Sequence, residues 1–393
     1  MKEIYSNINI VGGGLIGAFT AYSLAKIGFK ITIIEKKEPY KSIKNLDHRT
    51  VAISEGTKIF LNKIGLWEDI NKYAEPIKKI KVIDRKLSNS LEFDNGRRKS
   101  NLGYIVKNEH LLNIVYKKLK LQKNVRIFNN TKIVNFEKNI DTIKINLTNS
   151  IIVSNLNIAA DGKNSFVKQY YKTPYFIKDY KRTAIVLTFT HLKNHNNTAY
   201  EFFYKNGPLA ILPMQSMNGN FTSSIVWTNE QKYLNLISGL KNEKIISILD
   251  HYSQLAVGNI KQILSKQIFN LTAHLNTSFY EDRTIYVGDA AHSFHPIAGQ
   301  GWNLGMKDVE NLFNLIVKYK SLGIEIGGEF FCKEYHNDNY YNAYRLYQVT
   351  DKLDSFFQNQ NPIISLGRSF GLKYLQKNKK INNLISDFAM GIN

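Results

Sequence analysis

The chain has 393 residues, with 53 lysines and arginines against 32 acidic residues and a formal net charge of +21. A length above that of a typical single core predicts one large domain plus a second lobe, and 43% hydrophobic residues argue against disorder. The single cysteine, Cys332, excludes an intramolecular disulfide framework and a cysteine-based metal centre, so a reducing compartment fits best.

The first 35 residues have the pattern of a strand, a tight turn, a helix and a second strand. Residues 8–11 and 30–34 are short β-rich apolar runs, and residues 15–27 have helical spacing before the helix stop at Gly28. This order predicts the start of a βαβ unit.

The turn of this unit contains Gly12, Gly14 and Gly17 in the G-x-G-x-x-G spacing. Such glycines let the backbone approach a pyrophosphate, which then lies at the N-terminus of the helix. Glu35 ends the second strand, where a carboxylate typically hydrogen-bonds a ribose diol. The element predicts a dinucleotide site without separating NAD from FAD, and a different glycine-rich turn with a surface acid remains an alternative.

The next part of the chain mixes helical and strand patterns. Residues 54–64 and 108–119 have helical periodicity, and residues 151–159 are expected to form one buried strand. Further strands are expected at residues 125–128, 133–136 and 143–147. Asp161 and Gly162 follow the buried strand directly, a position that suits a cofactor contact or a simple β-turn.

The sequence between residues 183 and 228 is richer in alternating aromatic strands, which predicts an antiparallel sheet in a second lobe. The expected strands are residues 185–189, 200–204, 209–212 and 222–227. Helical patterns follow at residues 242–255, from 301 or 302 to 318, and at 337–357 and 361–389, with a strand at 284–287.

A long motif runs from Gly288 and Asp289 to Gly305, in the order GDAAHSFHPIAGQGWNLG. It is too long and particular for a simple turn. Its His292 and His295 form an H-x-x-H pair, but no third ligand cluster accompanies them, so we expect no metal site. Asp308, within the following helix, is as compatible with a solvated or capping role as with function.

These three motifs resemble the group A flavoprotein monooxygenases, and specifically the ubiquinone-biosynthesis hydroxylase family. The resemblance covers nearly the whole chain and also rests on residues 47–54, 102–108, 207–213, 226–228, 350–353 and 389–391. In two places the chain departs from the family pattern: Lys107 stands where an acid is expected, and Trp302 where phenylalanine is usual.

The resemblance implies an α/β fold: a Rossmann-like FAD-binding domain like that of para-hydroxybenzoate hydroxylase, an interleaved antiparallel-sheet substrate domain, and C-terminal helices. We expect the FAD-binding domain at residues 1–78, 101–181 and 275–345, the substrate domain at 79–100 and 182–274, and the helical region at 346–393. The residues expected to bind the cofactor are Gly12, Gly14, Gly17, Glu35, Arg49, Asp161, Gly162, Gly288, Asp289, Pro296, Gly299, Gln300, Gly301 and Asn303.

The resemblance also implies the chemistry. FAD reduced by NADPH or NADH would react with O2 to give a C4a-hydroperoxide, which hydroxylates the ring of a polyprenyl phenol. No side chain is assigned a catalytic role, because the cofactor performs the reaction. The alternatives are hydroxylation of a small soluble aromatic, a non-catalytic flavoprotein scaffold of a quinone-synthesis complex and, as the weakest, a plain Rossmann dehydrogenase.

The charge and the substrate class together suggest a location. No uncharged apolar run of about 20 residues is present, so a membrane-spanning helix is not expected. The positive charge suits a lysine-biased composition, an anionic membrane surface or nucleic acid, and no nucleic-acid-binding module is visible. We expect a cytoplasmic protein peripheral to the inner membrane, in contact with other ubiquinone-biosynthesis proteins and without a nucleic-acid partner.

Overall fold

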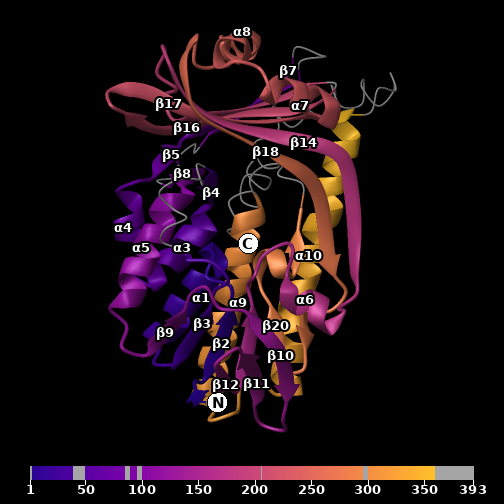
Figure 1. Ribbon diagram of the computed structural model, residues 1–393. Helices are drawn as coiled ribbons and strands as arrows, with labels where there is room; N and C mark the ends of the chain where they lie inside the picture. Colours follow the sequence, from indigo (N-terminus) through magenta and orange to yellow (C-terminus); the bar gives the residue numbers. More distant parts are fainter. Residues whose placement is uncertain are drawn as a thin grey trace.

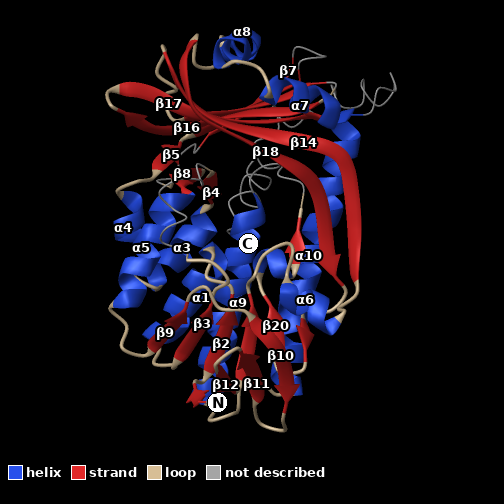
Figure 2. Cartoon of the chain, viewed as in Figure 1, coloured by secondary structure: helices blue, strands red, loops and turns tan. Residues whose placement is uncertain are grey.

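The structure is a computed structural model that describes residues 2–38, 49–84, 89–94, 100–204, 206–294 and 300–358. A parallel sheet with its helices forms the lower layer in Figures 1 and 2, and a large twisted sheet lies across the top. The long strands β14 (Tyr175–His191) and β18 (Ile260–Asn276) run from the upper layer down beside the lower one. The two layers are therefore interleaved in sequence.

The lower layer is built on a six-stranded sheet whose adjacent strands are parallel except at one edge. Its order is β19 (Tyr280–Glu281), β20 (Thr284–Tyr286), β13 (Leu156–Ala159), β2 (Ile8–Val11), β3 (Ile31–Ile34) and β9 (Val125–Phe128). Every residue of the four central strands is buried, as expected when helices cover both faces of a parallel sheet. The covering helices include α1 (Leu15–Lys26), α5 (Asn108–Lys120), α9 (Gln300–Ser321) and α10 (Glu329–Gln358).

The single strand expected at residues 151–159 is wrong, because two strands occupy this segment. β12 (Ser150–Ser154) belongs to a four-stranded sheet with β1 (Lys2–Tyr5), β11 (Ile143–Leu147) and β10 (Ile133–Lys138), whereas β13 belongs to the parallel sheet. Asn155 separates them. Its N–H donates to the carbonyl of Asn7 at 3.0 Å, and its carbonyl accepts from Arg283 Nη1 at 2.9 Å, so these groups are used outside both ladders.

The upper layer is an eight-stranded sheet. Its order is β21 (His292–Ser293), β18, β14, β17 (Asn220–Glu230), β16 (Gly207–Met217), β15 (Thr198–Tyr204), β6 (Lys79–Asp84) and β7 (Asn89–Asp94). The expected antiparallel pairing holds except between β15 and β6, which are parallel. β6 is drawn from a segment more than 100 residues earlier and is not joined to β15 by a hairpin. β14 is also much longer than the five-residue strand expected there, because it pairs with β18 along most of its length.

Smaller elements complete the two layers. The three-stranded sheet of β4 (Thr50–Ile53), β8 (Gly103–Lys107) and β5 (Glu75–Ile77) lies between them, beside α3 (Glu55–Lys63) and α4 (Trp67–Asn71). The upper sheet packs against α7 (Gln231–Ser238) and α8 (Asn242–Ser253), and the short helix α6 (Phe166–Tyr171) precedes β14.

The C-terminal part of the described chain is helical. α10 continues through residue 346, where the C-terminal region was expected to begin, and the helix expected at residues 361–389 lies outside the described residues. Within the described residues, no helix has both the length and the apolar character needed to cross a membrane. The proposed division into domains remains a prediction.

Candidate cofactor site

The glycine-rich turn between β2 and α1 combines close packing with one open position. A Cβ atom on Gly12, whose φ is +103°, would lie 2.4 Å from the carbonyl oxygen of Ala160, and one on Gly17 would lie 2.0 Å from that of Gly12. Gly14 is exposed, and no atom of a described residue lies within 4 Å of such a position. It starts α1 without a capping side chain, so the first N–H groups of the helix are available to an anion.

Glu35 is fixed beside this turn at the carboxyl end of β3. Its Oε2 accepts from the Gly13 N–H at 2.5 Å and its Oε1 from the Lys37 N–H at 2.9 Å. Tyr116 donates its hydroxyl to the Gly13 carbonyl at 2.7 Å. A carboxylate has about four acceptor positions, so Glu35 retains capacity for the hydroxyl groups of a ribose.

The third motif meets the first around Ile16, the second residue of α1. A Cβ atom on Gly288 would lie 3.0 Å from Ile16 Cγ1, and one on Gly305 of α9 would lie 2.8 Å from Ile16 Cδ1. Residues far apart in the sequence are therefore packed tightly, at the same edge of the parallel sheet. This is the edge at which α/β proteins bind nucleotides.

Asp289 is presented to the open space at this edge. Its side chain is exposed and makes no hydrogen bond with another described residue. Desolvation by the surrounding protein raises the pKa of Asp289, against the opposing charges of His292, Lys163 and Arg49. A carboxylate in this position can accept hydrogen bonds from a ligand.

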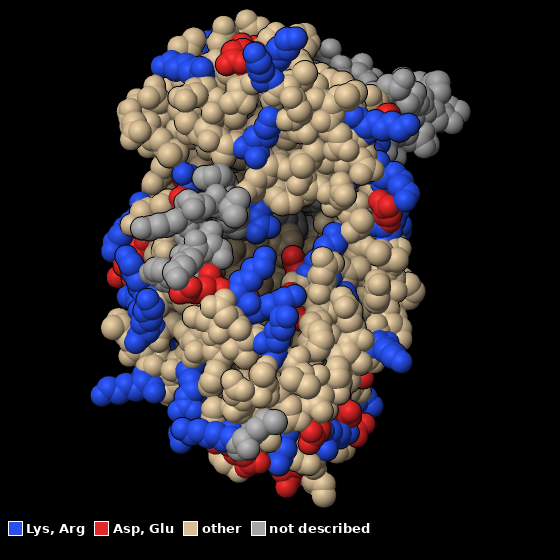
Figure 3. Space-filling model, viewed as in Figure 1, with Lys and Arg blue, Asp and Glu red and all other residues tan. Residues whose placement is uncertain are grey.

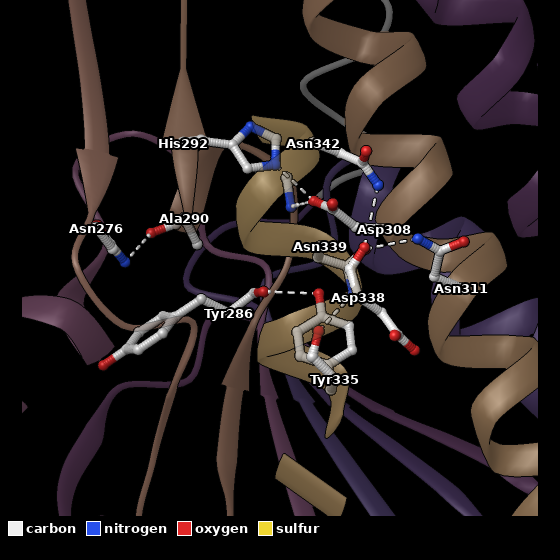
Figure 4. Close-up of polar contacts among 11 residues, drawn as sticks. Asn276, Tyr286, Ala290, His292, Asp308, Asn311, Tyr335, Asp338, Asn339 and Asn342 are labelled. Carbon is white, nitrogen blue, oxygen red and sulfur yellow. Dashed lines mark hydrogen bonds and ion pairs between the residues drawn. The ribbon is translucent and has the colours of Figure 1, made fainter. Parts of the chain in front are cut away.

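Asp308 is a structural partner of this motif that sequence reasoning left undecided. Its Oδ2 accepts from the Gly288 N–H at 2.9 Å and contacts His292 Nε2 at 2.7 Å, and both side chains are 1% exposed. Figure 4 shows Asp308 on α9 directed toward His292 beside η1 (Gly288–Ala290). The signal in the sequence is spacing: Asp308 is three residues after Gly305 and four before the buried Leu312, on the same face of α9.

Helix α10 packs against β20, the strand that leads into the third motif. Tyr335 donates its hydroxyl to the carbonyl of Tyr286 at 2.9 Å, immediately before the Gly288 turn (Figure 4). Asn276 Nδ2 donates to the carbonyl of Ala290 at 3.0 Å. His292 Nε2 contacts Asp308, and no group of three potential metal-binding side chains occurs in the described part of the chain; His295, the other histidine of the H-x-x-H pair, lies outside it.

The side chains of Asp161 and Asn303 form hydrogen bonds with backbone groups of neighbouring segments. Asp161 Oδ2 accepts from the N–H groups of Phe166 and Val167 at 2.7 and 3.3 Å, which places it at the start of α6. Asn303 Oδ1 accepts from the Ser54 N–H at 2.9 Å, and its Nδ2 donates to the carbonyl of Ala52 at 2.7 Å. These side chains join α6 to β13 and α9 to β4, respectively.

The other residues expected to bind the cofactor are Arg49, Gly162, Pro296, Gly299, Gln300 and Gly301. Arg49 is exposed, and its guanidinium lies 5.7 Å from the ring centroid of Phe269 in the upper sheet. A Cβ atom on Gly162 or Gly301 would have no neighbour within 4 Å. Pro296 and Gly299 lie outside the described residues, and Gln300 is the first residue of α9.

A cationic cavity of about 510 Å³ lies beside the Asp161 turn. Lys163 and Lys168 line it with His274, and Lys163 Nζ donates to the carbonyl of Thr272 at 2.8 Å. Lys168 is only 5% exposed, and desolvation lowers the pKa of both lysines. His274 is 2% exposed, its Nε2 has no hydrogen-bond partner among the described residues, and burial lowers its pKa to about 3.

The described groups fit a bound dinucleotide. The open N-terminus of α1, the carboxylate of Glu35 and the carboxylate of Asp289 lie at the carboxyl ends of parallel strands of one sheet. Figure 3 shows a hollow across this face of the molecule, between the two layers, with Lys and Arg side chains at its margin. Fold and site together are those of a dinucleotide-binding α/β protein.

Comparison with known proteins identifies the family. Residues 5–321 match the sequence model of the FAD binding domain family, and the chain belongs to that family. The ubiquinone hydroxylase UbiL of Rhodospirillum rubrum is 29% identical over 388 residues, which cover 98% of this chain and 90% of the relative. The 3-demethoxyubiquinol 3-hydroxylase of Escherichia coli is 25% identical over 392 residues, with coverage of 98% and 99%.

A solved structure supports the same fold. The crystal structure of p-nitrophenol 4-monooxygenase PnpA from Pseudomonas putida DLL-E4 matches with a TM-score of 0.81 and 16% sequence identity, over 99% of this chain and 98% of the other. The family resemblance inferred from the sequence is confirmed, and the chain belongs to the FAD-dependent monooxygenase family.

Proposed function

We propose that this protein hydroxylates the aromatic ring of a polyprenyl phenol in ubiquinone biosynthesis, using O2 and either NADPH or NADH. The observation that carries the proposal is that a chain of the FAD binding domain family has a large sheet lying over the edge of its parallel sheet where we expect the cofactor. The substrate class is supported by the ubiquinone and demethoxyubiquinol hydroxylases that match over nearly their full length.

Each cofactor group has a residue suited to bind it. The N–H groups of α1 after Gly14 would bind the pyrophosphate, Glu35 a ribose, and Asp289 the ribityl hydroxyls. The N-terminus of α9 would favour negative charge on the flavin ring by up to about 2 kcal/mol. When bound, FAD supplies the electron transfer and oxygen activation, and the chain orients the reactants and excludes water.

The cationic cavity is our candidate for part of the nicotinamide donor's binding site. It adjoins Asp161 and Gly162, and its lysines suit a phosphate or pyrophosphate group. Replacing Lys168 with glutamine should raise the KM for NADPH or NADH with little change in FAD content. The same replacement at Lys172, on the exposed rim of the cavity, should have a smaller effect.

The location is proposed from the substrate and the charge. A polyprenyl phenol is dissolved in the bilayer, and each basic residue near an anionic leaflet contributes about 1 kcal/mol to binding. We therefore expect reversible, salt-sensitive association of this cytoplasmic protein with the inner membrane, or with other ubiquinone-biosynthesis proteins. Sedimentation with anionic and neutral liposomes at low and high salt measures the association with the membrane.

The decisive experiment is chemical. The purified, flavin-loaded protein should oxidise NADPH or NADH faster in the presence of a prenylated phenol and add one oxygen atom to it, as measured by mass spectrometry. Oxidation stimulated only by a small soluble phenol would favour the alternative substrate class. A flavin-replete protein that turns over neither would favour a non-catalytic scaffold. Accumulation of an under-hydroxylated polyprenyl intermediate when the protein is absent would support the proposal in the cell.

A further inference from the structure

One face of the upper sheet is turned toward the cofactor layer. On β15, Tyr200, Phe202 and Tyr204 pack on the side of α7 and α8. Successive side chains of a strand alternate between faces, so Ala199, Glu201 and Phe203 lie on the opposite side. Ala199 confirms the direction, because it packs in a cluster with residues of the three-stranded sheet between the layers.

The surroundings of Glu201 on this face are apolar. It lies opposite Ala210 on β16 and Val82 on β6, and the same row continues through Val226 on β17 and Val186 on β14. Val226 and Val186 are partly exposed although they belong to central strands. They therefore border open space rather than a packed core.

The next row contains two hydroxyl groups without partners. Ser224 on β17 pairs with Thr188 on β14, and both side chains are buried. Among the described residues, neither Ser224 Oγ nor Thr188 Oγ1 has a hydrogen-bond partner. A buried hydroxyl without a partner is costly, so this row is suited to polar groups brought by a ligand.

Glu201 itself has no structural role among the described contacts. It forms no hydrogen bond or ion pair with another described residue, and it is partly exposed. Desolvation alone raises the pKa of Glu201 to about 7. A carboxyl group held among valine and alanine side chains without a donor needs one from elsewhere.

We propose that Glu201 is a catalytic residue that accepts the hydrogen bond of the substrate's phenolic hydroxyl while the apolar row holds the ring. The inference rests on the proposed function and extends it by naming the group that recognises the phenol. The aliphatic neighbours suit an aromatic ring, and the carboxylate distinguishes a phenol from an ether of the same shape.

The chemistry is a reversible proton transfer. As oxygen is added to the ring, the phenolic O–H bond breaks, the proton moves to a Glu201 oxygen, and the electron pair left on the phenolic oxygen increases electron density in the ring. When the hydroxylated carbon loses its hydrogen as a proton to solvent water and the ring becomes aromatic again, Glu201 returns its own proton to the phenolic oxygen. The residue is regenerated, and a group with a pKa near neutrality is suited to both directions.

The first test is binding. Calorimetric titration of the FAD-loaded protein with 2-farnesylphenol and with its methyl ether should show a preference of about 10- to 100-fold for the phenol, the range of a hydrogen bond to a charged acceptor. Glu201→Leu should abolish that preference, and Glu201→Gln, which keeps an acceptor of the same shape, should reduce it. Glu230→Gln, at an exposed position of the same sheet, is the matched control.

The second test is the pH profile of the flavin-loaded enzyme with the same phenol. The rate should rise with pH through about 7 in the wild type, as the Glu201 carboxyl group ionises, and Glu201→Gln should lose this rise. Other charged groups on this face or on the elements against it are Asp84, Arg182, Glu75, Lys107 and Arg49. Glu201 variants should retain full FAD content, which separates this effect from cofactor loss.

The outcomes separate the two proposals. If wild-type protein binds the phenol and its ether equally, or Glu201→Leu keeps the preference, the role of Glu201 is overturned and the proposed function stands. If wild-type protein binds neither compound, the proposed function fails, and the role of Glu201 fails with it. If Glu201→Gln still binds the phenol more tightly than the ether but its rate no longer rises with pH, the proton transfer is confirmed separately from recognition of the phenol.

Discussion

Polar side chains at the edge of the lower sheet and on the inner face of the upper sheet differ in their hydrogen-bond partners. At the edge of the parallel sheet, Glu35, Asp161 and Asp308 each bind backbone N–H groups of the turns beside them. On the inner face of the upper sheet, the carboxylate of Glu201 and the hydroxyl of Ser224 have no described partner. These three acids therefore maintain the turns at the edge of the lower layer, where Asp289 is the exception, whereas Glu201 and Ser224 of the upper layer are left for another molecule.

The difference follows from strand pairing. The lower turns connect strands to helices, where free N–H groups require acceptors, and acids supply them. The middle of a sheet has no free backbone groups, so a polar side chain there has only its neighbours or a ligand to bind. Mutations can test whether the acids of the lower layer divide into those that maintain the turns and those that contact the cofactor.

The largest expected effect is at Asp308. Asp308→Ala leaves His292 and the Gly288 N–H buried without their acceptor, so the free energy of unfolding should fall by about 3–5 kcal/mol. Urea unfolding of the flavin-free protein measures this loss. Asp308→Asn keeps an acceptor oxygen and should lose less, and a loss below about 1 kcal/mol in the alanine variant would contradict the assigned role.

The next effect concerns pH and the buried histidine of the cationic cavity. His274 has a pKa of about 3 in the folded chain, against an ordinary value of 6.5. As the pH falls below 6.5, the unfolded chain binds a proton that the folded chain does not, so stability falls by up to about 1.4 kcal/mol per pH unit. His191, with a pKa of about 4, acts in the same direction, whereas the raised pKa of Glu201 opposes both.

Replacing His274 measures its contribution to the pH dependence of stability. His274→Asn keeps an acceptor for the Ser293 hydroxyl, which lies 2.9 Å from His274 Nδ1. Between pH 6.5 and 4, unfolding of the variant should take up about one proton fewer than unfolding of the wild type, so its unfolding free energy should fall less steeply as the pH falls. Urea unfolding at several pH values measures this slope. The same replacement at the exposed His251 is the control. An unchanged slope in His274→Asn would show that His274 is protonated in the folded protein.

Local patterns were sufficient to predict the first βαβ unit of the lower layer. The strand expected at residues 8–11 is β2, and the helix expected after the glycine turn is α1, because apolar runs bounded by glycines identify them without distant partners. Glu35 could be placed because it directly follows β3. The segment 151–159 could not be divided correctly, since the contacts of Asn155 come from residues 7 and 283.

Less of the upper layer could be predicted. The 17-residue strand β18 was not recognised, because its polar sequence forms a strand through pairing with β14. Alternation along residues 200–204 predicts that some side chains face outward, but not whether they face solvent or a pocket. Glu201 therefore became a candidate only when the neighbouring strands and their exposure were known.

A smaller effect separates two acids that follow neighbouring parallel strands. Asp289→Ala should weaken FAD binding roughly 10- to 100-fold with little change in the stability of the flavin-free protein, because its side chain makes no described hydrogen bond. Asp161→Ala should instead lower the unfolding free energy by about 1 kcal/mol, as expected for the loss of a helix N-terminal acceptor. Fluorescence titration with FAD and urea unfolding measure the two effects. Equal loss of FAD affinity in both variants would remove the distinction.

The smallest structural change is at Gly14, where the lower layer is expected to be open to the cofactor. Gly14→Ala adds one methyl group in a position with no atom of a described residue within 4 Å, so the flavin-free protein should lose only about 0.5 kcal/mol of unfolding free energy, because alanine is a poorer N-cap residue than glycine. FAD affinity should still fall several-fold, because the methyl group would lie where the pyrophosphate approaches the N-terminus of α1. Gly17→Ala is the matched comparison, since its Cβ would lie 2.0 Å from the Gly12 carbonyl and damage the fold itself. Unchanged FAD affinity in Gly14→Ala would place the pyrophosphate elsewhere, because a protein that tolerates the methyl group and still binds FAD fully has no ligand atom at that position.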